Sequence, residues 1–139
     1  MGSKKGAIAA SVYALGGLVG IPWFALGGGI GYVFQPTFGF IIAFIPGSFI
    51  AGYFKELSTD MSQKKKIIMT IIGSVIATLL VWVLGILYLS AIYQYYLQIE
   101  FGVFIALTSI FSFSFLADLI LAVLVSFVGH RIQHRLAII

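Results

Sequence analysis

The sequence predicts an all-α membrane protein, in which residues 1–139 form a single transmembrane domain built as a bundle of about four helices. The first observation is composition: the chain is 61% hydrophobic and 9% charged, whereas about one quarter of a soluble domain is charged. Its mean hydropathy is +1.14. The second observation is that long apolar segments alternate with short polar or glycine-rich stretches. A lipid bilayer is therefore the expected environment.

The first apolar segment runs roughly from Gly6 to Phe24 and follows a short basic start, MGSKK. Such a start also resembles a signal peptide, but further apolar segments follow, so we interpret this one as a membrane span. Small residues such as Ala10 and Ala14 allow close approach of helix backbones in a membrane. Packing within the chain is favoured over docking of another subunit.

Two further spans are expected, roughly Pro36 to Lys55 and Ile67 to Leu89. Proline is tolerated in the first turn of a helix, and Thr37 or Gln35 is the candidate cap there. Pro46 predicts a kink in the middle of the first of these spans. The second holds 23 residues without a charge, enough to cross a hydrocarbon core of about 30 Å.

The last apolar stretch, Phe101 to Gly129, is too long for one simple span and contains a cluster of serine and threonine. One interpretation is an interfacial or re-entrant piece near Phe101 to Ile110, followed by a final span from about Ser112 to His130. A single tilted helix is the alternative. The sequence does not decide between them.

The basic residues indicate the orientation. With four spans, all eight lysines and arginines fall on one side of the membrane, and the positive-inside rule makes that side the cytoplasm. We therefore expect a multi-pass protein of the cell membrane with both termini in the cytoplasm. A glycine-aromatic loop within Ile21 to Phe40, and the stretch Tyr93 to Tyr96, then face outward. The basic residues are Lys4, Lys5, Lys55, Lys64, Lys65, Lys66, Arg131 and Arg135.

The glycine-aromatic loop is the first candidate binding element. Glycine permits tight turns and close approach, and the aromatic residues supply flat apolar surface, so we interpret the stretch as an ordered loop that closes over a small ligand. The alternative for Trp23, as for Tyr93, Tyr95 and Tyr96, is an interfacial belt. The candidate binding residues are Trp23, Phe24, Gly28, Gly29, Tyr32, Gln35, Thr37 and Phe40.

Asp118 is the second candidate, because it is the acidic residue inside an apolar span. Burying it in a membrane costs about 2.5–3.5 kcal/mol, so it is expected to face a cavity or a partner. We expect it about two turns below the outer surface, with Tyr88 and the loop aromatics as neighbours. A ligand bearing N–H groups is favoured as its partner, and a structural bond to another helix or to a loop amide is the alternative.

Other chemistries are not indicated. The sequence has no cysteine, no nucleophile–base–acid set and no phosphate-binding loop, so no enzyme, catalytic residue or cofactor is expected. His130 and His134 have a spacing that zinc uses, but arginines flank them, and no metal site is predicted. Nucleic acid is not an expected partner, because the basic residues lie at membrane edges.

The stretch GGLVGIPWFALGGGIGYVFQPTFGF, residues 16–40, resembles the glycine-rich signature of the BioY family. These proteins are the biotin-specific substrate-binding (S) components of energy-coupling factor (ECF) transporters. LGILYLS, residues 84–90, resembles a glycine-aromatic span of the family, and ADLILAVLV, residues 117–125, resembles its last helix, which carries an aspartate.

The resemblance implies a non-enzymatic vitamin uptake protein that captures biotin outside and works with a membrane T component and two ATPase subunits. It also implies the last four helices of a six-helix fold, without the first two. Asp118 matches the family's aspartate, whereas Leu121 stands where the family often has a lysine. The alternative is a small four-span scaffold or oligomer protein that binds no ligand.

Overall fold

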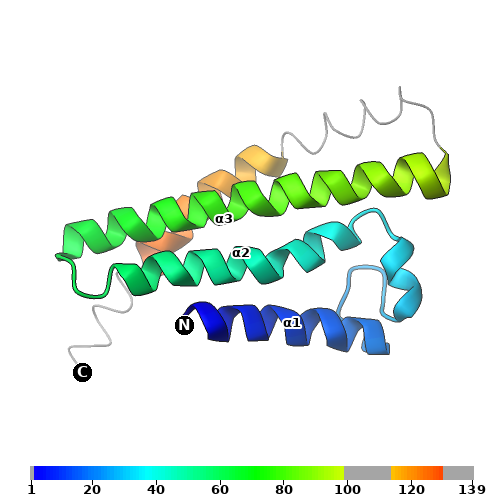
Figure 1. The fold of residues 1–139 in the computed structure, drawn as a ribbon, viewed down its shortest axis with the longest axis horizontal. Helices are drawn as coiled ribbons and strands as arrows, with labels where there is room; N and C mark the ends of the chain where they lie inside the picture. Colours follow the sequence, from blue (N-terminus) through cyan, green and yellow to red (C-terminus); the bar gives the residue numbers. More distant parts are fainter. Residues whose placement is uncertain (1, 99–113, 130–139) are drawn as a thin grey trace.

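The computed structural model describes residues 2–98 and 114–129, and this part of the chain is helical without a strand. The all-α prediction is therefore confirmed (Figure 1). The His130–His134 pair and the expected piece at Phe101 to Ile110 lie outside the described residues. The elements are α1 (Ser3–Val19), the 3-10 helix η1 (Ile30–Phe34), α2 (Phe38–Leu57), α3 (Gln63–Ala91), the π-helical η2 (Ile92–Leu97) and the helix Ser114–Gly129.

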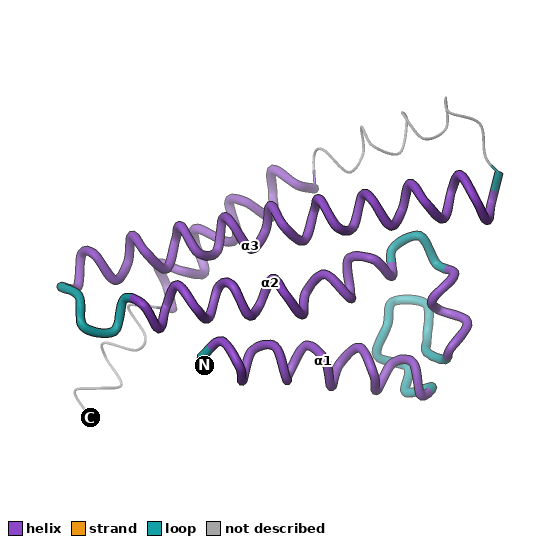
Figure 2. The backbone as a smooth tube through the Cα atoms, in the orientation of Figure 1, coloured by secondary structure: helices purple, strands orange, loops and turns teal. Residues whose placement is uncertain are grey.

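The helices lie side by side, with α2 between α1 and α3 (Figure 2). Two of the described helical units are long and apolar enough to cross a membrane: α2 and the continuous run Gln63–Leu97. The latter has 35 residues and a mean hydropathy of 2.6, so the third span extends beyond both of its predicted ends. The remaining helices, α1 and Ser114–Gly129, are shorter, and the count of four spans stays a prediction.

The first helix ends earlier than expected, at Val19 rather than Phe24. Gly20 adopts a left-handed conformation with φ 114°, and its N–H donates to the carbonyl groups of Gly16 and Gly17. Glycine tolerates this conformation because it has no Cβ. Trp23 and Phe24 therefore belong to the loop and not to the span.

The prediction of a side-chain cap at the start of the second span is wrong. Thr37 occupies the N-cap position of α2 but makes no side-chain capping bond. Backbone turns replace it, because the Phe38 N–H donates to Gln35 O at 3.0 Å and the Phe40 N–H donates to Thr37 O at 3.1 Å. Further along, α2 remains helical through Pro46, and Figure 1 shows its two halves inclined to one another.

Glycines allow α2 and α3 to pack closely. A Cβ added to Gly39 would lie 2.2 Å from the Tyr88 side chain, and one added to Gly85 would lie 2.3 Å from the Phe40 ring. Further down, Gly47 would meet Val81 and Gly73 would meet Phe54. Large side chains of each helix thus fill the space above a glycine of the other, which is how small residues bring membrane helices together.

The start of α1 is attached to the end of α2. The Glu56 carboxylate accepts the Ser3 N–H at 2.7 Å and the Ser3 hydroxyl at 2.8 Å. A carboxylate at a helix N-terminus is favourable, because the unpaired N–H groups there carry partial positive charge. The described basic residues, Lys4, Lys5, Lys55 and Lys64–Lys66, gather at this same end, where α1 begins, α2 ends and α3 begins.

Candidate functional site

The loop between α1 and α2 folds back onto the bundle at the opposite end. Phe24 and Gly27 exchange two backbone hydrogen bonds of 3.0 Å, and the Gly29 N–H donates to Gly17 O at 2.7 Å. A Cβ at Gly28 would lie 2.3 Å from the carbonyl oxygen of Ile21. The loop is thus ordered by its own backbone, and glycine is required where it touches the end of α1.

An aromatic cluster fills the space beneath this loop. Phe24, Tyr32 and Phe38 are buried, with 4%, 8% and 2% of their surface exposed. The Phe24 and Tyr32 rings are 4.5 Å apart, and the Tyr88 ring lies edge-on to Phe38 at 6.1 Å. The Tyr88 hydroxyl also donates to the Val33 carbonyl. We call Phe24, Tyr32, Phe38 and Tyr88 the loop cluster. All but Phe38 are predicted site residues, and they do meet, but their rings contact one another as a small hydrophobic core.

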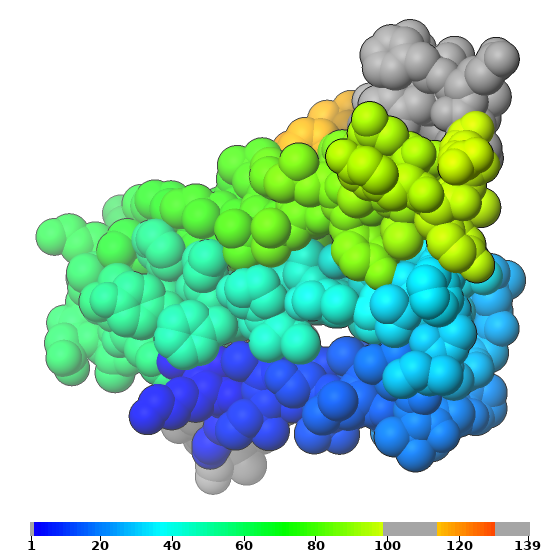
Figure 3. All heavy atoms as spheres, turned by 45° about the vertical axis from the view of Figure 1, so that its right-hand side comes forward, coloured from blue at the N-terminus to red at the C-terminus, as the bar shows by residue number. Residues whose placement is uncertain are grey.

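The remaining loop candidates lie outside this cluster. Trp23 is exposed, its ring stacks on Tyr13 at 6.2 Å, and the Tyr13 hydroxyl donates to the Trp23 carbonyl at 3.1 Å. The side chains of Gln35 and Thr37 are exposed. A contact that the sequence did not indicate closes the same end of the molecule, since Phe34 stacks on Tyr96 of η2 at 5.0 Å. In Figure 3, cyan atoms of the stretch that leads into α2 lie against the yellow-green atoms at the end of α3 and η2.

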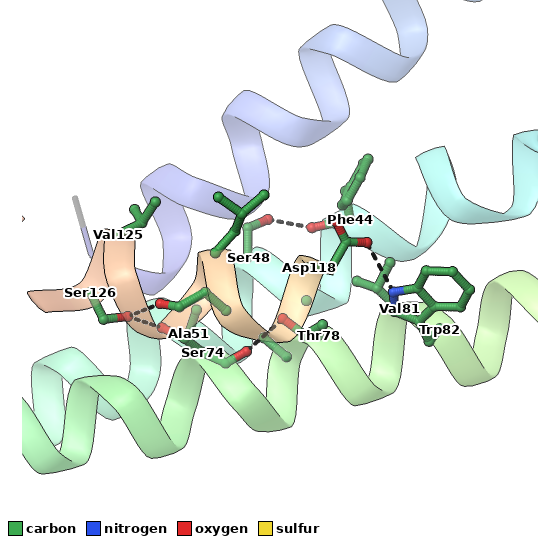
Figure 4. A pocket seen from close by; sticks show the side chains of 14 residues that line it. Phe44, Ser48, Ala51, Ser74, Thr78, Val81, Trp82, Asp118, Val125 and Ser126 are labelled. Carbon is green, nitrogen blue, oxygen red and sulfur yellow. Dashed lines mark hydrogen bonds between the residues drawn. The ribbon is translucent and has the colours of Figure 1, made fainter. Parts of the chain in front are cut away.

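Asp118 lies elsewhere, on the helix Ser114–Gly129 beside the middle of α3. Its Oδ2 accepts a hydrogen bond of 3.1 Å from the indole Nε1 of Trp82 (Figure 4). The two residues border a groove of about 450 Å³ between α2, α3 and the helix Ser114–Gly129. The groove is lined by Phe44, Gly47, Ser48, Ala51, Ser74, Ala77, Thr78, Val81, Trp82, Asp118, Leu121, Ala122, Val125 and Ser126.

The predicted site residues are thus divided between two places. Tyr88 belongs to the loop cluster, whereas Asp118 contacts Trp82, six residues earlier on α3. Six helical residues correspond to about 9 Å along the axis. Phe40 lies between the two places, because it packs against Gly85 and its ring lies 5.3 Å from that of Trp82.

Of the residues that line the groove, the sequence interpretation named Asp118 as a site residue and missed the others, Trp82 among them. A usable signal was present, since the indole N–H of a tryptophan inside an apolar span requires an acceptor, and Asp118 is the acidic residue of another apolar segment. The described residues contain no group of three or more metal-ligating side chains. Within this part of the molecule, the groove offers hydrogen bonding and apolar contact.

Comparisons with known proteins agree with these features. A model described as the BioY family matches residues 1–138. The "Probable biotin transporter BioY" of Lysinibacillus sphaericus is 32% identical over 127 residues, which is 91% of this chain and 59% of the relative. The "Putative biotin transporter BioYB" of Bacillus subtilis strain 168 is 43% identical over 77 residues, 55% of this chain and 38% of the relative.

The chain therefore spans less than two thirds of the length of these relatives. No solved structure matches it at a significant level. The family model covers nearly every residue, including the loop and the helix that carries Asp118, and the family is one of transporters rather than of enzymes. The resemblance found in the sequence is confirmed: this chain belongs to the BioY family.

Proposed function

We propose that this chain is a biotin-binding, substrate-capture subunit of an ECF-type vitamin uptake transporter. It lies in the cell membrane with both termini in the cytoplasm and works with a T component and two ATPase subunits. Family membership and the names of the relatives support biotin as the ligand. The observation that carries the proposal is the Asp118 carboxylate, held by Trp82 at the edge of an otherwise largely apolar groove.

The chemistry of the groove suits a ureido ring with an apolar tail. A carboxylate accepts several hydrogen bonds, so the bond from Trp82 leaves Asp118 able to accept a ureido N–H as well. Such a charge-assisted bond contributes about 1.5–3 kcal/mol. Apolar side chains such as Phe44, Val81 and Leu121 line the groove, where they bury the hydrocarbon part of the ligand.

The loop cluster has a different part in this proposal. It closes the outward end of the bundle, with the bond from Tyr88 to Val33 attaching the loop to α3. Biotin enters past this loop, and Phe40 separates the loop cluster from Trp82 and the groove. The loop residues then control access, and Asp118 provides the polar contact to the ligand.

Calorimetry on detergent-purified protein tests the proposal. Asp118→Asn keeps the shape of the side chain but removes the charge, so biotin should bind roughly 10- to 100-fold more weakly. Asp60→Asn is the matched control, because Asp60 is exposed between α2 and α3, and it should bind as the parent does.

Three outcomes are informative. Equal biotin affinity of the parent and Asp118→Asn would indicate that this aspartate has a structural role and does not contact the ligand. Weaker binding by both variants would indicate a general loss of charge rather than a site at Asp118. Absence of biotin binding by the parent chain would leave the four-span scaffold as the better interpretation.

A further inference from the structure

Three helix ends meet at the end of the molecule opposite the loop cluster: α1 begins, α2 ends and α3 begins there (Figure 1). The Ser3 N–H and hydroxyl both donate to the Glu56 carboxylate, so the start of α1 lies against the last turn of α2. Residues 58–62 then lead directly into α3. Six lysines belong to these helix ends, and we call them the lysine face: Lys4, Lys5, Lys55, Lys64, Lys65 and Lys66.

The chain supplies little negative charge to the lysine face. Glu56 and Asp60 are the acidic residues in the same stretch of chain, and both oxygens of Glu56 accept hydrogen bonds from Ser3. Among the contacts of the residues that the structure describes, no ion pair joins a lysine of this face to either carboxylate. The first turns of α1 and α3 contain no acidic residue. Because like charges repel one another, this face is stabilised by negative charge from outside the chain.

The lysine side chains are accessible to such a charge. Four of the six are exposed, and the other two, Lys55 and Lys66, are half-buried. A lysine can lay its hydrocarbon stem along apolar surface while its ammonium group stays in polar surroundings. The lysine face therefore presents its charges at the polar edge of apolar helices, where phospholipid headgroups lie in a membrane.

Exposed apolar side chains continue from the lysines along two of the helices. On α1, Ile8 follows Lys4 by four residues and is 61% exposed. On α3, Ile68 follows Lys64 at the same spacing and is 55% exposed. Residues four apart lie on one face of a helix, one turn from each other. Each face thus combines an ammonium group with apolar surface one turn further in, which fits an anionic phospholipid, whereas an inorganic anion would leave the apolar part uncovered.

We infer that the lysine face binds the headgroups of anionic phospholipids, whose acyl chains lie along the apolar faces of α1 and α3 that continue from the lysines. The inference goes beyond the proposed function, because this face lies away from the loop cluster and lipid binding there requires no biotin. An anionic headgroup supplies the negative charge that the chain itself lacks at this end. One lysine near an anionic membrane surface favours association by about fivefold.

Electron spin resonance on the full chain in phosphatidylcholine vesicles tests this, with spin-labelled phosphatidylglycerol and spin-labelled phosphatidylcholine as the two probes. The protein should prefer phosphatidylglycerol about fivefold at low salt, and about 1 M sodium chloride should abolish the preference by screening the lysine charges. A preference below about twofold at low salt would overturn the inference and favour an acidic protein surface as the partner. Sodium phosphate should act only as strongly as sodium chloride of equal ionic strength. A stronger effect of phosphate would indicate a site for a free anion and would also overturn the inference.

Two triple variants at the start of α3 give a matched comparison. The variant with Lys64→Gln, Lys65→Gln and Lys66→Gln keeps a similar helix propensity, and its preference for phosphatidylglycerol should fall by about half or more. Arginine at the same three positions retains the charge and should keep the preference of the parent. Both variants should unfold at the Tm of the parent in phosphatidylcholine vesicles. A preference that glutamine leaves unchanged, or that both variants lose equally, would contradict binding of the headgroup by these charges.

Discussion

The Tyr88 hydroxyl of α3 donates a hydrogen bond to the Val33 carbonyl of the loop, 55 residues earlier in the chain. The ring of the same tyrosine packs against Phe38 and covers Gly39 at the start of α2. One side chain therefore joins three elements: the loop, α2 and α3. The placement of the loop over the end of the bundle depends on this contact.

Removing that hydroxyl should loosen the loop and leave the helices in place. Tyr88→Phe keeps the ring contacts but leaves the Val33 carbonyl without this donor, a loss of about 1 kcal/mol. We expect a lower Tm and faster hydrogen exchange at residues 29–35. Tyr95→Phe is the matched control, because Tyr95 is 78% exposed. Equal exchange rates in both variants would mean that the hydrogen bond does not hold the loop.

Gly28 should tolerate no side chain. Gly28→Ala would place its Cβ 2.3 Å from Ile21 O and 2.8 Å from Gly17 O, and such overpacking costs about 1–3 kcal/mol. Gly31→Ala is the matched control, because nothing lies within 4 Å of a Cβ added there. Thermal unfolding should show a lower Tm for the first variant alone. Identical Tm values would show that the loop moves aside without cost.

Glu56→Gln should destabilise the start of α1. The amide oxygen still accepts one bond from Ser3, but the carboxylate charge at the helix N-terminus is lost. We expect a modest decrease in Tm relative to the parent that shrinks as salt is added, since salt screens surface charges. Asp60→Asn removes a similar charge from the neighbouring turn and should leave Tm unchanged. A decrease that persists in high salt would contradict the electrostatic explanation.

Labelling of single cysteines in intact cells tests the orientation, and the chain suits it because it has no cysteine of its own. Gln63 and Gln98 are exposed at opposite ends of the run that begins with α3. A membrane-impermeant maleimide should react with Gln98→Cys from outside and with Gln63→Cys only after the cells are opened. The reverse pattern would place the termini outside.

Local signals in the sequence predicted the helices well and their ends less well. Apolar length indicated α2 and α3, because a helix in lipid must satisfy its backbone internally and the apolar residues are contiguous. The end of α1 depends on the left-handed conformation of Gly20. The sequence alone did not indicate which of the glycines at positions 16, 17 and 20 would adopt it, because any glycine can. The side-chain cap predicted at Thr37 is likewise absent because of how the loop folds: backbone turns of the loop supply the hydrogen bonds at the start of α2.

The sequence by itself determined the helical class, the family and the identity of Asp118 as the acidic residue inside an apolar span, because composition, motif and charge are properties of the chain alone. Only the tertiary structure decided that Asp118 meets Trp82 and that Tyr88 meets Val33. Those pairings depend on how far each helix is shifted and rotated against its neighbour. The Tyr88 side chain packs over Gly39 and the Phe40 ring packs over Gly85. These contacts between α2 and α3 determine how the two helices are aligned.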